Sequence, residues 1–548
     1  MRRGLHTFVP PEAAPAALWC CLGAALVIHG CSGPERARPR ELAAAPRAPV
    51  AAAPVPAPAP APVAAAPAPV DPWEHRPAPP TAEPDLRVRI AALRAANASP
   101  RFTHPSGSLL VAPPGAAPRA YRTPVEVRFT GTGWAVTEAV GTAKSRCQEL
   151  AGIQPVEVRP LPKARVVVGY DETDWPGPVR IVPVAEGGGP GAVDLVVDVP
   201  LERYLPGVLA KELFKNWHPE TFRAQAIAAR SFAVCEHAHW QAIRHYDLIA
   251  GEASQAWVGE VKDQRPRDAV AKTRGMVLVW DGRVVPAYYS STCGGTPANA
   301  TESLTRNPHH GIAPLMAGTG AGAADRDCCA EAPKFRWQQV LSNKAMCAQL
   351  RRWANDQLEA AEPTRTETAP PAGALGAKAP AATAAVASAS VQGGAPAAPA
   401  PLPAVPAPAA APRVASNGVT EIADAPLAAI ASINRIASLR VVAQNAAGRP
   451  SRIRIVDDRG RTLEMRAEDF RRAVNYAREG EKPPADRLFS SAIATAAVSG
   501  DKVTLTGSGL GHGVGMCQFG AQGAAAKGAT AEAILSTYYP GAAIRRAY

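Results

Sequence analysis

The stretch VPLERYLPGVLAKELFKNWHPETFRAQAIAARSFAV, residues 199–234, decides the fold. Pro219 lies where a helix can begin, because proline at the first helical position has no amide hydrogen to leave unbonded. Apolar residues then recur at spacings of four, three and four: Phe222, Ala226, Ala229 and Ala233. This spacing predicts a helix with one apolar face. The small side chains on that face let another element approach the helix closely.

Short Val-rich runs, each bounded by Gly, Pro or Asp, lie on both sides of this helix and predict β-strands. Before the helix they are residues 86–93, 125–131, 164–170, 179–184 and 193–200. After it they are residues 275–282, 283–290, 438–445, 451–458, 492–499 and 502–509. A last helix is expected from Thr530 to just before Pro540. Strands and helices without strict alternation predict an α+β fold.

Two tracts rich in Pro and Ala divide the chain, which has 57 Pro among 548 residues. Residues 32–84 favour extended polyproline-like conformations and are expected to form a semi-rigid spacer. Residues 357–415 have the same composition and are expected to form a disordered insertion, since long insertions cost little closure entropy. The folded parts are therefore predicted at 85–356 and 416–548, as one interrupted unit.

The amino terminus is expected to be a signal peptide, residues 1–31. Arg2 and Arg3 precede an apolar stretch, residues 13–28, that ends shortly before Cys31. The cysteine after a small residue resembles a bacterial lipobox and predicts a lipid anchor on Cys31. The alternative is ordinary cleavage beside it and a soluble exported product. The stretch is shorter than the ~20 residues of a membrane-spanning helix.

The net charge of +12 is spread along the chain rather than gathered into basic runs. A nucleic-acid-binding surface would cluster its basic residues, so no nucleic-acid partner is expected. The excess charge fits a general attraction to an anionic cell envelope.

Seven cysteines lie outside the signal region, and in an oxidising compartment some are expected to pair. They are Cys147, Cys235, Cys293, Cys328, Cys329, Cys347 and Cys517. Paired CxxC motifs are absent from the sequence, which disfavours a zinc site of the finger or ribbon kind. No metal or cofactor is therefore predicted.

Three segments together resemble the SpoIID/LytB family, that is, stage II sporulation protein D and LytB-like amidase enhancers. They are residues 199–234, AYYSSTCGGTPANATES at 287–303, and GSGLGHGVGMCQFGAQGAAAKGATAEAILSTYYPGAAI at 507–544. The resemblance implies a two-lobed α+β domain of mostly antiparallel strands, located in the cell envelope or periplasm. It also implies a role on peptidoglycan, as a lytic transglycosylase or as an activator of a cell-wall amidase.

By motif position the resemblance assigns the catalytic acid to Glu212. One carboxyl group suffices for a lytic transglycosylase, unlike the carboxylate pair of most glycoside hydrolases. It protonates the oxygen between N-acetylmuramic acid and N-acetylglucosamine, then deprotonates the muramic 6-hydroxyl, which closes to a 1,6-anhydro sugar. The acid needs a raised pKa, and the apolar neighbours Leu213 and Phe214 favour one. The alternative is a solvated carboxylate or an ion pair with Lys211 or Lys215.

Further residues are expected to contact glycan: Gln225, Arg230, Ser291, Thr292, His512 and Gln518. The glycines around His512 predict a loop that lines the glycan groove. A structural role satisfied by backbone groups is an equal alternative for His512. For Arg230 the alternatives are a solvated side chain and burial with a partner. Glu202 is expected to have a structural or capping role.

Some family members carry zinc on a His and two Cys just after the Ala-rich helix. In this sequence His245 is present, but Ile249 and Ser254 occupy the places near which the cysteines are expected. Cys517 stands where members usually have Ser, and Leu315 near where many have Tyr. Two non-catalytic alternatives remain open, namely a glycan-binding module that activates an amidase and a lipoprotein that tethers the outer membrane to the wall.

Overall fold

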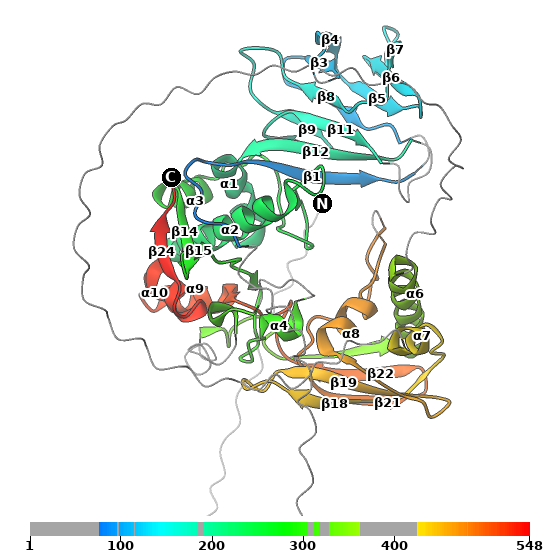
Figure 1. Ribbon diagram of the computed structural model, residues 1–548, viewed down its shortest axis with the longest axis vertical. Helices are drawn as coiled ribbons and strands as arrows, with labels where there is room; N and C mark the ends of the chain where they lie inside the picture. The colour runs from blue at the N-terminus through cyan, green and yellow to red at the C-terminus, as the bar shows by residue number, and fades with distance from the viewer. Residues whose placement is uncertain are drawn as a thin grey trace, which may run out of the picture. The chain divides into compact units, whose positions relative to one another are not determined.

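The structure is a computed structural model that describes residues 76–95, 98–113, 115–184, 191–304, 311–316, 328–361, 425–478 and 481–548. The predicted signal peptide, Cys31 and most of the two Pro/Ala-rich tracts lie outside these residues. Within them, mixed helices and mostly antiparallel strands confirm the predicted α+β class (Figure 1). No helix of the described part combines the length and apolar character needed to span a lipid bilayer.

A seven-stranded sheet with the order β13-β1-β12-β11-β8-β3-β4 forms the first part of the fold. Its strands are β1 Asp85–Leu93, β3 Ser108–Ala112, β4 Arg119–Arg122, β8 Val156–Arg159, β11 Val179–Pro183, β12 Val193–Pro200 and β13 Leu248–Ile249. The strand β1 runs antiparallel to β12, with Asp85 opposite Pro200. Because β12 ends at Pro200 and a helix begins at Leu201, this sheet sets where the helix starts.

A second, four-stranded sheet of order β2-β5-β6-β7 and a β9-β10 hairpin complete this part. Their strands are β2 Arg101–Phe102, β5 Val125–Phe129, β6 Gly133–Glu138, β7 Arg146–Ala151, β9 Val168–Tyr170 and β10 Thr173–Trp175. Apolar residues of both sheets, such as Val88, Val127 and Leu195, are fully buried in one cluster. Period-two alternation of the strands therefore places one face of each sheet in this core.

Three helices follow: α1 Leu201–Glu212, α2 Pro219–Trp240 and α3 Gln264–Lys272. The helix α2 begins at Pro219, as predicted, and the His218 side chain caps it by accepting the Glu220 N–H at 3.3 Å. The predicted stripe from Phe222 to Ala233 is buried at no more than 1% exposure. Both α1 and α3 pack against α2. Three of the four stripe residues are alanines, whose small side chains allow this close packing.

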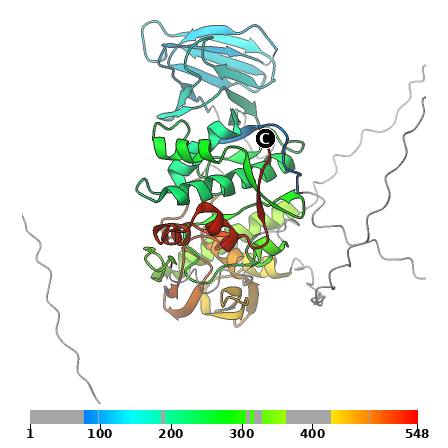
Figure 2. The same ribbon diagram turned by 90° about the vertical axis from the view of Figure 1, so that its left-hand side faces the viewer.

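The carboxyl-terminal segment returns to this helical layer. Its elements are β23 Met516–Cys517, α9 Gln518–Ala526, α10 Ala531–Tyr538 and β24 Ala543–Arg546. The predicted last helix is confirmed, with Thr530 as its cap. The strand β24 pairs antiparallel with β14 Met276–Trp280, which also pairs with β15 Arg283–Val284 (Figures 1 and 2). The strand β23 pairs in parallel with β16 Tyr289–Ser290 and so joins two of the family-like segments.

The remaining elements build two three-stranded sheets, β17-β22-β21 and β18-β19-β20, with helices around them. The strands are β17 Trp337–Ser342, β18 Ile436–Gln444, β19 Pro450–Asp457, β20 Thr462–Arg466, β21 Ile493–Ser499 and β22 Lys502–Gly507. The helices are α6 Asn343–Ala361, α7 Ala425–Ala431 and α8 Ala467–Val474, and the short α4 Ala300–Ser303 and η2 Ala313–Leu315 precede them. Met346 and Leu350 of α6 share one core with Ile453 and Phe470.

The folded unit extends beyond two of the predicted boundaries. Arg76, assigned to the spacer, is 1% exposed and donates to the carbonyls of Trp280 and Val284 at 3.2 and 3.3 Å. A buried guanidinium that satisfies carbonyls of the β14-β15 hairpin fixes residue 76 to the domain. At the other boundary α6 continues to Ala361, past the predicted end at residue 356.

Candidate active site

Glu212 is the last residue of α1, at the point where Leu213 turns to extended backbone with φ −118°. Its two carboxylate oxygens have different donors. The Ala256 N–H donates to Oε1 at 3.0 Å, and the Gln518 side-chain amide donates to Oε2 at 3.1 Å. The predicted catalytic carboxyl therefore contacts the glycine-rich tail segment, 306 positions further along the chain.

Burial raises the pKa of Glu212, and this is the largest influence on that group. The hydrogen bonds from Gln518 and Ala256 and the charge of Lys211 lower the pKa, while the charge of Glu252 raises it, and the net direction is upward. The carboxyl accepts from an amide N–H and a carboxamide, which differs from the solvated carboxylate of the alternative interpretation. A raised pKa suits a general acid.

Gln225 and Gln518 lie beside Glu212, so the structure brings three of the predicted site residues together. The Gln518 side chain is 4% exposed and also donates to Gln225 Oε1 at 3.5 Å. Gln225 projects from α2 and is fully buried, and its amide nitrogen lacks a hydrogen-bond partner among the described residues. Such an unpaired buried donor is costly unless something else satisfies it.

A network that the sequence did not reveal fixes the Ala256 N–H. Gln255 is 1% exposed, and its side chain accepts from the Tyr204 hydroxyl at 3.2 Å. Its amide donates to the Ala229 carbonyl at 3.2 Å and to the Tyr289 hydroxyl at 3.1 Å. The next residue is Ala256, so these bonds hold the donor to Glu212 in place.

Three aromatic side chains, from the segment after Glu212 and from the residue after Gln518, pack together. Phe214, two residues after Glu212, is 55% exposed. Its ring lies 5.2 Å from the Trp217 ring and 6.0 Å from the Phe519 ring, and these two are 5.0 Å apart. Trp217 is buried and Phe519 is half-buried, so Phe214 is the exposed ring of the three. An exposed aromatic ring is typical of a binding site. Its position between Lys211 and Lys215 was a signal in the sequence that Phe214 is more than an apolar neighbour of Glu212.

Ser291 and Thr292 form backbone hydrogen bonds to the tail segment, and the Thr292 side chain also has a partner within its own turn. The Ser291 carbonyl accepts the Phe519 N–H at 3.1 Å, and Thr292 exchanges backbone hydrogen bonds with Leu510 at 3.2 and 2.8 Å. The Thr292 side chain is 1% exposed and accepts the Gly294 N–H at 3.3 Å. These residues therefore fix the tail segment beside the 287–303 turn.

His512 has the contacts of the structural alternative. Its Nδ1 accepts the Val514 N–H at 3.0 Å. Burial lowers the pKa of His512 to about 4, so the ring is neutral at physiological pH. This bond fixes the turn of the tail segment, and a substrate contact of His512 stays a prediction.

The substrate-binding role predicted for Arg230 is corrected by its burial. The side chain is fully buried and forms two hydrogen bonds of 2.8 Å with the two carboxylate oxygens of Glu202. Glu202 also accepts from the Gly275 N–H at 3.1 Å and the Tyr548 hydroxyl at 2.7 Å. Arg230 therefore fulfils the alternative of burial with a partner, and Glu202 has the expected structural role.

The residues aligned with the zinc site of some family members have structural partners. His245 Nε2 lies 2.8 Å from an oxygen of the buried Asp194. Ile249 belongs to β13, and its N–H donates to the Ser254 hydroxyl at 3.2 Å. Leu315 is 2% exposed within a hydrophobic cluster.

The seven described cysteines form no disulfide with one another, in contrast to the expected pairing. Three of them, Cys293, Cys329 and Cys517, are buried together. Hydrogen bonds from Cys293, Cys517 and the Thr292 hydroxyl, which outweigh burial, lower the pKa of the Cys329 thiol to about 3.

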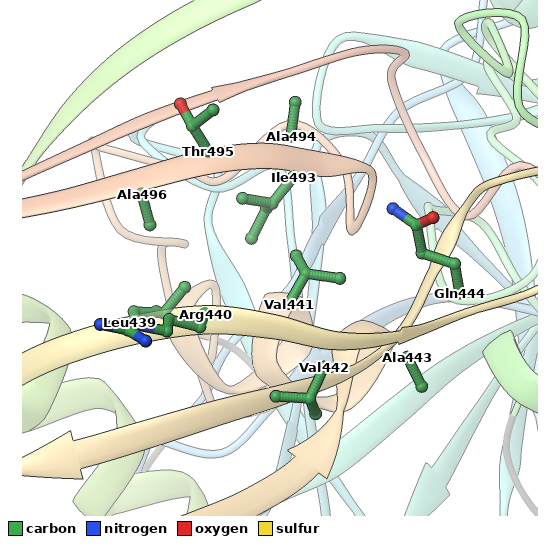
Figure 3. Close-up of a pocket in the computed structure, with 10 residues that line it drawn as sticks. All are labelled: Leu439, Arg440, Val441, Val442, Ala443, Gln444, Ile493, Ala494, Thr495 and Ala496. Atoms are coloured by element: carbon green, nitrogen blue, oxygen red, sulfur yellow. The ribbon is translucent and has the colours of Figure 1, made fainter. Parts of the chain in front are cut away.

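A separate groove lies between β18 and β21, which are edge strands of their two sheets (Figure 3). Val441 and Ile493 point toward one another in it, and the polar side chains of Arg440, Gln444 and Thr495 also line it. None of the predicted site residues lines this groove, so the candidate site remains the one around Glu212.

Comparison with known proteins gives a match of residues 190–280 to the family model described as SpoIID, stage II sporulation protein. The chain is 31% identical over 102 residues to an uncharacterized protein of Brachyspira hyodysenteriae, covering 18% of this chain and 28% of the relative. It is 31% identical over 120 residues to stage II sporulation protein D of Bacillus subtilis, covering 19% and 35%.

A longer match joins the chain to the amidase enhancer of Bacillus subtilis, with 22% identity over 337 residues, 62% of this chain and 39% of that protein. The chain thus spans between 28% and 39% of the length of these relatives. The model match contains Glu202, Glu212, Gln225 and Arg230, and it falls on the first of the three motifs. Residues 190–280 are therefore similar to the SpoIID family, and the longer match extends the similarity to an amidase enhancer.

Proposed function

We propose that this protein is an exported cell-wall enzyme, a lytic transglycosylase that cleaves peptide-stripped peptidoglycan glycan strands. The observation that carries the proposal is the Glu212 carboxyl. It is partly buried, its pKa is raised, and it has one donor from the first half of the chain and one from the tail. The similarity to the SpoIID family supports the same class of substrate.

In the first step the protonated Glu212 donates its proton to the oxygen between muramic acid and glucosamine, and the C1–O bond breaks. In the second the Glu212 carboxylate accepts the proton of the muramic 6-hydroxyl, whose oxygen bonds to C1. The products are a 1,6-anhydro end and a free 4-hydroxyl, and the carboxyl is protonated again. The Gln518 amide and the Ala256 N–H stabilise the carboxylate between the two steps.

The scheme needs no second catalytic carboxylate, because the substrate supplies its own nucleophile. Glu252 is the carboxylate whose charge raises the Glu212 pKa. It forms an ion pair with Arg487, mainly through hydrogen bonding, and this lowers its own pKa. Glu252 is therefore assigned an electrostatic influence on the Glu212 pKa and no proton-transfer step.

Sugar binding is assigned to the exposed ring of Phe214, which packs against Trp217 and Phe519. Aromatic faces offer large contact areas to the apolar faces of sugar rings. Phe214 lies two residues after Glu212, and Phe519 follows Gln518 directly.

The test uses peptide-free glycan strands incubated with the wild type, Glu212→Gln and the control Glu532→Gln, which alters an exposed glutamate of α10. Mass spectrometry counts 1,6-anhydro ends. We expect Glu212→Gln to lower the rate by about 10²–10⁴-fold, the usual contribution of a general acid, with Glu532→Gln unchanged. Equal rates for Glu212→Gln and the wild type would exclude the proposed role.

A second candidate, activation of a cell-wall amidase, is favoured by the 337-residue match to the amidase enhancer. In that case the protein binds stripped sacculi, forms no anhydro ends, and accelerates an added amidase. Glu212→Gln would then retain full activation. Both assays on the same preparations separate the two functions.

The lipid anchor on Cys31 is part of the proposal. A membrane-bound protein that becomes soluble in a Cys31→Ser variant would support it, whereas unchanged partitioning would refute it. Shortening residues 33–80 tests the tether interpretation, in which spacer length matters more than Glu212.

A further inference from the structure

Cys293, Cys329 and Cys517 form a buried cluster of three thiols. Their exposed fractions are 2%, 1% and 1%, and their sulfur atoms all lie within 4.8 Å of one another. Cys293 belongs to the 287–303 turn, Cys329 to the segment before β17, and Cys517 to β23. Three segments distant in sequence thus converge on one point.

The sulfur spacing fits metal coordination better than a disulfide. The Cys293 and Cys329 sulfurs are 3.9 Å apart. A disulfide requires about 2.05 Å. A tetrahedral ion with metal–sulfur bonds of about 2.3 Å places neighbouring sulfurs about 3.8 Å apart. The sulfur of Cys517 also lies within 4.8 Å of the other two, and a single Cys293–Cys329 disulfide would not require a third sulfur there.

The surroundings stabilise thiolate charge. The Cys517 sulfur accepts the N–H groups of Cys293 at 3.4 Å and Gly520 at 3.2 Å, the latter at the amino end of α9. Backbone donors and helix amino termini favour thiolates. The buried Arg449 guanidinium contacts the Cys293 carbonyl at 3.5 Å and interacts electrostatically with the Cys293 thiol. A cation at this place offsets the excess negative charge of three thiolates on one metal ion.

We propose that Cys293, Cys329 and Cys517 bind a thiophilic metal ion with a filled d shell, Zn²⁺ or Cu⁺. Soft thiolate ligands select these ions. The site differs from the zinc site of some family members, because neither His245 nor a residue near it in sequence is among the proposed ligands. The three cysteines have no CxxC or other local spacing pattern, so the sequence alone did not predict this metal site.

A bound metal would brace the catalytic donor. Cys517 immediately precedes Gln518, which donates to Glu212. The ion would therefore fix the first residue of α9 to the 287–303 turn and hold Gln518 in place. This positioning role rests on the proposed function, whereas metal binding does not.

The experiment uses the purified full chain, reduced and stripped of metal, and titrates it with Zn²⁺ and, anaerobically, with Cu⁺. We expect about one equivalent of at least one ion to bind, as in a single thiolate site. Binding should protect three thiols from a thiol reagent. Co²⁺ in place of the native ion should give thiolate-to-cobalt charge-transfer absorption. Serine variants at the three positions should lose this binding, whereas Cys147→Ser and Cys347→Ser should keep it.

Thiol protection is measured on the wild type, so it decides the question even where a serine variant fails to fold. Two results would overturn the proposal: reduced, folded protein that binds neither ion stoichiometrically, or a Cys293–Cys329 disulfide in the protein isolated from the envelope. Metal removal has a separate readout of positioning. A loosened Gln518 no longer lowers the Glu212 pKa, so the alkaline limb of the turnover profile should move to higher pH.

Discussion

Replacing Arg230 by methionine is expected to destabilise the fold by about 3–5 kcal/mol, the usual cost of removing one partner of a buried ion pair. The side chains of Arg230 and Glu202 are 0% and 7% exposed. Two charge-assisted hydrogen bonds of 2.8 Å are lost, each worth about 1.5–3 kcal/mol. The Gly275 N–H and the Tyr548 hydroxyl still donate to Glu202, which places the expected loss near the lower end, about 3 kcal/mol.

Equilibrium urea denaturation followed by tryptophan fluorescence measures this loss. The Arg230→Met/Glu202→Gln double variant should recover part of it, because the carboxylate is no longer left buried without its cation. The control Arg223→Met breaks a pair with Glu220 whose side chains are 32% and 19% exposed, and should cost less than about 1 kcal/mol.

The loss should also depend on pH. Burial raises the pKa of Glu202, but the charge and hydrogen bonds of Arg230 and the hydrogen bonds from Tyr548 and Gly275 outweigh it. The pKa of Glu202 in the wild type is therefore lowered. A lowered carboxyl pKa contributes stability that is present above the unfolded-state pKa and is lost as pH falls through the folded-state pKa. The difference between wild type and Arg230→Met should therefore shrink in acid. Unchanged stability of Arg230→Met together with lost glycan binding would refute the structural assignment and restore a direct substrate role.

Three further perturbations test the site and its supports. Glu252→Gln removes a charge that raises the Glu212 pKa, so the alkaline limb of the turnover profile should move to lower pH, and an unmoved limb would contradict that coupling. Phe214→Ala should raise KM about tenfold with kcat unchanged, measured on glycan strands, because the ring contributes binding that is equal in ground and transition states. Gly509→Ala should lower the free energy of unfolding, measured by urea denaturation, by more than about 1 kcal/mol, because a Cβ there would lie 2.7 Å from the Thr292 carbonyl oxygen. The control Gly448→Ala changes a glycine with the same φ of +79° and open space around it. Equal losses in the two variants would refute the close-approach argument.

The sequence predicted those features that depend on local pattern. The stripe from Phe222 to Ala233 follows helical spacing, and its buried face is the observed one. The position of Glu212 in the family-like motif and the glycine-rich context of Gln518 pointed to these two residues, which the fold brings into contact. Contacts that tertiary packing creates leave no local pattern in the sequence. Examples are the hydrogen bond from the Ala256 N–H to Glu212 and the ion pair between Arg230 and Glu202.

The absence of a local pattern also explains why the cysteine cluster was not predicted from the sequence. Cys293, Cys329 and Cys517 carry no recognisable spacing, and the parallel pairing of β16 with β23 brings two of them together. The domain boundary was misplaced for a related cause. Arg76 stands in a proline-rich context that resembles a spacer, while its guanidinium satisfies carbonyls far along the chain.

The span of 306 positions between Glu212 and Gln518 also bears on when the site is assembled. A polypeptide emerges from the ribosome with its amino end first. Glu212 is therefore made long before its amide donor. A site built in this way stays incomplete during synthesis until the segment that carries Gln518 has emerged and packed against α1.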